Sequence, residues 1–100
     1  MLNSRQRAQL RGLGNGLETI FQIGKSGITE NLVAQVDGAL TARELIKGRV
    51  LETSPLTARE ACEELCRAVR AEPVQVIGTR FILYRPGRTL PPEKRIRLVR

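Results

Sequence analysis

The sequence predicts a single α/β domain in which helices pack on a four-stranded mixed sheet. Short runs rich in β-branched and aromatic residues alternate with segments whose apolar residues recur at helical spacing. The chain has 100 residues, the length of one ordinary domain. The elements follow in the order α-β-α-β-α-β-β, and such alternation with crossover helices is typical of a mostly parallel sheet.

Caps, turns and periodicity set the expected element boundaries. Ser4 caps the first helix, Thr29 the second, and Thr57 with Glu60 forms a capping box for the third. Gly48 weakens its strand and indicates a bulge or a close approach, and Gly78-Thr79 predicts a two-residue hairpin. The expected elements are helices at 4–12, at 29–42 and from Thr57 to before Pro73, and strands at 17–23, 44–52, 74–77 and 81–84.

The charge of the chain favours a polyanionic partner. There are 17 basic and 10 acidic residues, giving a net charge of +7 and a sequence pI of about 10.7. No segment pairs a basic face with a strongly apolar one, so nucleic acid is favoured over a membrane surface. With two Phe, one Tyr and no Trp, base stacking on an exposed aromatic sheet is not expected.

Gly24-Lys25-Ser26-Gly27 is the motif that points most directly to a ligand. It lies between an expected strand and an expected helix, and KH modules grip RNA backbone with such a GxxG loop. The glycines permit a tight turn and close approach. The following helix start favours anions. The structural alternative is a simple turn.

The chain lacks the residues of common catalytic and metal sites. It contains no His, and its two cysteines, Cys62 and Cys66, are spaced to share one helix face as buried free thiols. The scattered carboxylates share no motif, so neither an enzyme nor a cofactor is expected. Reduced thiols, no signal peptide and no membrane span predict a cytoplasmic protein.

Four sequence blocks in collinear order resemble the YhbY-like family, also called the CRM domain. They lie at 4–13, 23–29, 39–47 and 74–86. The resemblance implies a compact RNA-binding fold similar to the C-terminal domain of translation initiation factor three, with a KH-like GxxG loop that contacts RNA. Single-domain bacterial members are associated with precursors of the large ribosomal subunit. Residues 1–86 are expected to form this domain, and 87–100 an extended basic tail.

The candidate RNA-binding residues are the GxxG loop and basic residues from several elements. The loop is expected to supply the grip, and the strand and helix cations to extend a basic track, although a solvated surface explains the latter nearly as well. Glu44 is expected to be a structural partner for a nearby basic residue. The candidates are Gly24, Lys25, Ser26, Gly27, Lys47, Arg49, Arg5, Arg7, Arg11, Arg80 and Arg85.

The expected function is non-enzymatic binding of ribosomal RNA during large-subunit assembly, by a monomer without metal. Other structured RNAs, such as transfer or intron RNA, remain alternatives. A second class is an adaptor that holds an acidic protein through residues 87–100; deleting the tail would then matter more than Lys25→Ala. Enzymatic RNA turnover and DNA binding are weaker alternatives.

Overall fold

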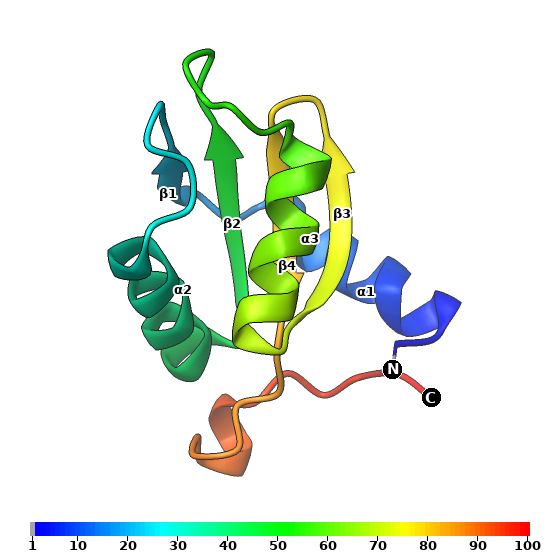
Figure 1. Cartoon of the computed structure of the whole chain (residues 1–100). Helices are drawn as coiled ribbons and strands as arrows, with labels where there is room; N and C mark the ends of the chain where they lie inside the picture. Colours follow the sequence, from blue (N-terminus) through cyan, green and yellow to red (C-terminus); the bar gives the residue numbers. More distant parts are fainter. Residues whose placement is uncertain (1) are drawn as a thin grey trace.

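The computed structural model describes residues 2–100 and has the expected order of elements (Figure 1). Three helices and four strands form the domain, and a short 3-10 helix lies near the C-terminus. Their bounds are α1 Ser4–Asn15, β1 Thr19–Ile23, α2 Glu30–Arg43, β2 Leu45–Val50, α3 Ala58–Val69, β3 Glu72–Ile77, β4 Arg80–Tyr84 and η1 Pro92–Lys94.

The sheet is mixed, as expected, but it is mostly antiparallel. Its strand order is β1-β2-β4-β3; β1 and β2 pair in parallel, whereas β4 runs antiparallel to both of its neighbours. The crossover helices do leave β1, β2 and β3 pointing the same way. The expectation of a mostly parallel sheet was wrong because the Gly78-Thr79 hairpin inserts β4 between β2 and β3.

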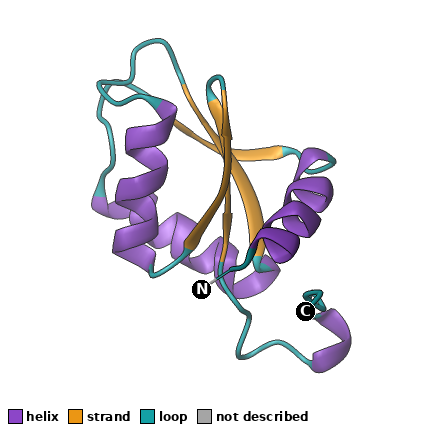
Figure 2. Ribbon diagram, turned by 90° about the vertical axis from the view of Figure 1, so that its right-hand side faces the viewer, coloured by secondary structure: helices purple, strands orange, loops and turns teal. Residues whose placement is uncertain are grey.

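Helices cover both faces of the sheet and create two apolar clusters (Figure 2). The larger cluster lies under α2 and α3 and includes Phe21, Ile46 and Leu83. The smaller lies under α1 and includes Leu10 and Tyr84. Alternation along each strand places neighbouring residues on opposite faces, so the sheet is buried against α2 and α3 on one side and partly by α1 on the other.

The helix caps agree with the sequence at α2 and α3 and differ at α1. The Thr29 and Thr57 side chains accept hydrogen bonds from the first turns of their helices. The cap of α1 is Asn3, not Ser4, and it forms a reciprocal capping box with Gln6. The helix also continues through Gly12 to Asn15, because Gly14 is buried against Ile82, where an added Cβ would lie only 2.6 Å from that side chain.

Gly48 makes the close approach that was one of its two expected roles. It pairs with Phe21 on β1 and with Phe81 on β4, and a Cβ added at Gly48 would overlap the Phe21 ring. The two phenyl rings meet edge to face with centroids 5.7 Å apart. The glycine therefore makes room for an aromatic pair in an otherwise aliphatic core.

Residues 87–100 fold back onto the domain and do not extend from it. The buried Glu44 carboxylate accepts hydrogen bonds from the backbone N–H groups of Gly87, at 2.7 Å, and Ile96, at 2.6 Å. Ile96 and Leu98 pack against the α1-side cluster. Glu44 is thus structural, as expected, but its partners are backbone donors and not a basic side chain.

Candidate nucleic-acid interface

The GxxG loop is an exposed turn between β1 and α2. The Gly27 N–H donates to the Gly24 carbonyl at 3.0 Å, which closes a four-residue turn. Gly27 has φ +66°, a left-handed conformation that favours glycine. Lys25 and Ser26, at the tip, are exposed. The expected turn is therefore present, with its polar side chains directed outward.

The two loop glycines have different requirements. A Cβ at Gly24 would lie 3.7 Å from Leu51 and Thr53, an ordinary contact, so nothing in the protein itself excludes a side chain there. At Gly27, the backbone conformation already disfavours one, and Pro55 would lie 3.5 Å away. The absence of a side chain at Gly24 would let a ligand approach the backbone closely, and this role of Gly24 stays a prediction.

A second group of candidates lies on the half of the sheet that α1 leaves uncovered. Strand register places one row across all four strands and a second row across β2, β4 and β3. We call this surface the open sheet face. The outer row is Gln22, Arg49, Arg80 and Ile77. The inner row is Lys47, Ile82 and Gln75, and here Ile82 is buried against Gly14 of α1, so this row borders the covered half of the face.

Like charges oppose one another on the open sheet face. Arg49 and Arg80 are direct cross-strand partners, an arrangement that destabilises a sheet. Arg49 donates through Nε and Nη2 to the Gln22 Oε1 at 3.1 and 2.8 Å. Lys47 Nζ lies 3.5 Å from the Asn15 carbonyl. The Arg80 guanidinium is exposed and, within residues 2–100, has no hydrogen-bond acceptor, so it is available to an external anion.

The loop and the open sheet face lie close together at one end of the sheet. The Leu51 N–H donates to the Ile23 carbonyl immediately before the loop, and the Val50 N–H donates to the Thr79 carbonyl in the hairpin. These bonds tie the loop after β1, the end of β2 and the β3–β4 hairpin into one edge, seen at the top of Figure 1. Neighbouring strands are about 5 Å apart, so one ligand can span the loop and both arginines.

The α1 arginines lie elsewhere. Arg7 donates through Nη1 to the Pro73 carbonyl at 2.6 Å, at the start of β3. The strands β3 and β1 are opposite edges of the sheet, so this part of α1 is remote from the GxxG loop. Arg5 is exposed and Arg11 half-buried. The structure therefore does not gather these three candidates with the loop.

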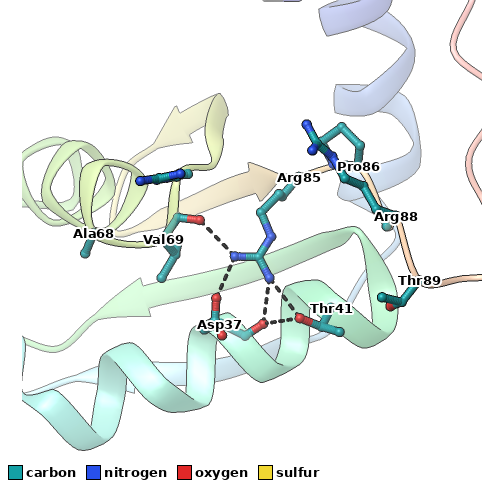
Figure 3. A pocket seen from close by; sticks show the side chains of 10 residues that line it. Asp37, Thr41, Ala68, Val69, Arg85, Pro86, Arg88 and Thr89 are labelled. Carbon is teal, nitrogen blue, oxygen red and sulfur yellow. Dashed lines mark hydrogen bonds and ion pairs between the residues drawn. The ribbon is translucent and has the colours of Figure 1, made fainter.

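Arg85 makes an internal clamp between α2, α3 and β4 (Figure 3). Its Nη1 donates to the Asp37 carboxylate at 2.6 Å and to the Val69 carbonyl at 2.8 Å. Its Nη2 donates to the Asp37 carbonyl and to Thr41 Oγ1, both at 2.9 Å. Because both terminal nitrogens already have protein acceptors, Arg85 has an evident structural role, which the sequence alone did not indicate.

Other kinds of site receive no support from the described part of the chain. Cys62 and Cys66 are buried free thiols, as expected. No group of three or more His, Cys, Asp or Glu side chains among residues 2–100 is placed to hold a metal ion. Nor does any helix in that range have the length and apolarity needed to cross a membrane.

Sequence reasoning missed two residues beside the cations. Gln75 and Ile77 lie on the open sheet face, and Ile77 is 60% exposed. A hydrophobic side chain facing solvent on an edge strand could have been suspected from the alternation of β3. The irregular register between Pro73 and Gln75 hid it, because the bulge changes which residues share a face.

Comparisons with known proteins agree with this fold. The model of the CRS1 / YhbY (CRM) domain family matches residues 2–85. The probable RNA-binding protein YqeI of Bacillus subtilis is 38% identical over 88 residues, covering 88% of this chain and 92% of that protein. An RNA-binding protein of Haemophilus influenzae is 34% identical over 86 residues, covering 86% and 87%. The solution structure of the hypothetical protein SAV1595 from Staphylococcus aureus superposes with a TM-score of 0.73 at 46% identity, covering 85% of this chain and 88% of that one.

Proposed function

Because the chain belongs to the CRS1 / YhbY (CRM) domain family, we propose that it binds RNA as a non-catalytic assembly factor. Its relatives in Bacillus subtilis and Haemophilus influenzae carry RNA-binding names. The RNA we propose is precursor ribosomal RNA of the large subunit, which follows from the resemblance of the four sequence blocks. The setting is the cytoplasm, where free thiols such as Cys62 and Cys66 persist.

One observation carries this proposal: opposed arginines beside an exposed GxxG loop. Arg49 and Arg80 face each other across β2 and β4 without an intervening carboxylate in the register. Two positive charges at this separation repel, and a phosphate between them removes the repulsion. A net charge of +7 adds longer-range attraction for a polyanion.

Phosphate contact at the loop would come mainly from its side chains. The positive end of α2 lies directly after the loop, but Glu30 is in its first turn and partly compensates that end. Thr29 already accepts the Leu32 N–H. Lys25 supplies a cation and Ser26 a hydroxyl donor, and both are exposed. Gly24 leaves the backbone accessible between them and the sheet.

The structure disfavours the adaptor alternative in its simplest form. That alternative needs residues 87–100 as a free basic arm. Glu44 instead anchors the start and middle of this segment, and Gln9 exchanges hydrogen bonds with its end, through Arg97 and Val99. The tail is thus part of the packed domain.

Sedimentation of a cell lysate tests the proposal. The wild type is expected to migrate with precursors of the large subunit, and the double variant Gly24→Asp, Lys25→Glu to remain near the top of the gradient. A matched control, Gly38→Asp with Arg67→Glu, makes the same charge change on α2 and α3, where a Cβ at Gly38 meets nothing within 4 Å. The proposal fails if the wild type stays at the top at low salt, or if both double variants behave alike.

A further inference from the structure

A small cavity opens on the open sheet face between the end of α1 and the β3–β4 hairpin. Its volume is about 170 Å³, and Lys47, Gln75, Ile77 and Arg80 line it. Pockets for whole small-molecule ligands measure roughly 300–1,000 Å³. This cavity is therefore suited to one small planar group at the end of a larger ligand that lies across the sheet.

One residue that lines the cavity has a polar atom without a partner. Gln75 Oε1 is buried and, within residues 2–100, accepts no hydrogen bond. Buried amide oxygens almost always have a donor, since leaving one unpaired is destabilising. The glutamine side chain has three rotatable bonds, so a modest rotation brings the amide to the cavity, where a ligand N–H can satisfy it.

The surroundings of Gln75 combine apolar and cationic character. Ile77 is 60% exposed and offers an apolar surface. Arg80 is the cross-strand partner of Ile77 on β4, and Lys47 lies one strand further on, on β2, opposite Ile82. Arg80 has no hydrogen-bond acceptor among the described residues. An amide acceptor, an apolar surface and two nearby cations match the parts of a nucleotide: base edge, base plane and phosphate.

The aromatic residues do not provide an alternative stacking surface. Phe21 and Phe81 are buried in the cluster under α2 and α3, and although Phe81 borders the cavity, its ring packs edge to face on Phe21. Tyr84 is buried beneath α1. A base on this face therefore meets Ile77, and its edge meets an amide.

We propose that this cavity holds a single unpaired nucleobase of the bound RNA, whose edge donates an N–H to the Gln75 amide. Ile77 packs on the plane of the base, and the neighbouring cations contact the adjoining phosphates. The proposal rests on the proposed RNA binding and adds a source of base preference to it. The GxxG loop, which reads backbone, would supply affinity without such preference.

The test compares Gln75→Leu with wild type on single-stranded oligo(A), oligo(C) and oligo(U) of equal length. Leucine keeps the approximate size and removes the amide. Wild type is expected to prefer one base, and Gln75→Leu to lose roughly fivefold in affinity for it, the effect of one hydrogen bond, with its salt dependence unchanged. Ala68→Leu, on the exposed surface of α3, is the control for an added leucine side chain and should bind like wild type.

Folding is checked by the melting temperature of each variant. Removing an unpaired buried oxygen should leave that of Gln75→Leu equal or higher. If it falls, Ile77→Ser replaces it as the test variant, since an exposed side chain can change without loss of packing; it should weaken binding to all three oligonucleotides.

The outcomes separate the two proposals. If wild type binds RNA but the cavity variant keeps the same affinities and base preference, the nucleobase site is refuted while RNA binding stands. If wild type binds none of the oligonucleotides and no ribosomal RNA fragment, the proposed function itself fails.

Discussion

Replacing Arg80 with alanine should stabilise the protein and weaken its binding of RNA. Arg80 faces Arg49 across β2 and β4. At the usual cross-strand side-chain spacing of about 5.5 Å, two unit charges in water repel by roughly 0.8 kcal/mol, and this is an upper value because the Arg49 guanidinium is bound toward Gln22. Removing one should therefore raise the free energy of unfolding by about 0.5 kcal/mol, and the melting temperature by about 3 °C for a domain of this size. No described hydrogen bond of the Arg80 side chain is lost in exchange.

The loss in RNA affinity follows from counterion release. One phosphate contact contributes about 0.8 to the slope of log affinity against log salt, which corresponds to roughly sixfold in affinity at 0.1 M salt. Fluorescence anisotropy over a salt series measures both quantities, and urea unfolding measures stability. Arg80→Lys should restore the slope, and Arg67→Ala on α3 should leave it unchanged. Equal salt slopes for wild type and Arg80→Ala would refute the assignment of Arg80 to the interface.

Three further predictions concern the fold. Gly48→Ala places a methyl group against the Phe21 ring and should destabilise the domain by about 1–3 kcal/mol in chemical denaturation, whereas unchanged stability would show that the ring moves aside freely. Glu44→Ala leaves two backbone donors of the tail without their acceptor and should make the 87–100 segment sensitive to trypsin, while equal cleavage of wild type would refute the anchoring. The backbone N–H of Thr57 lowers the pKa of the Glu60 carboxyl in the folded protein. The ionised Glu60 therefore stabilises α3 at pH values above its unfolded-state pKa, and this stabilisation is lost as the pH falls through its folded-state pKa. Wild type should lose stability between about pH 5 and 3 more steeply than Glu60→Gln, and parallel stability curves would contradict this.

Much of the fold could be predicted from local sequence signals. The capping box at Thr57, the cap at Thr29 and the Gly78-Thr79 hairpin are determined by neighbouring residues, and the structure contains all three. Strand neighbours are set by longer-range packing. The sequence showed a hairpin after α3, but it did not show that the second strand of that hairpin pairs with β2.

The site was predictable to the extent that it depends on the loop. The GxxG turn was visible as a motif, and the alternation of Lys47 and Arg49 placed both on one strand face. The roles of Arg85 and Glu44 depend on contacts made 48 and 52 residues away in the sequence. Such tertiary contacts leave no local sequence pattern. From the sequence alone, Arg85 and Glu44 therefore could not be distinguished from ordinary surface charges.

Photo-crosslinking of the protein to ribosomal RNA, followed by mass spectrometry of the linked peptides, tests the central claim most directly. The predicted crosslinks lie in the loop at 24–27 and on the open sheet face at 47–49 and 75–80, and Lys25→Glu with Arg80→Glu should abolish them. Crosslinks confined to the exposed surfaces of α2 and α3, or to residues 87–100, would contradict the account, because RNA would then contact a surface other than the loop and the uncovered half of the sheet.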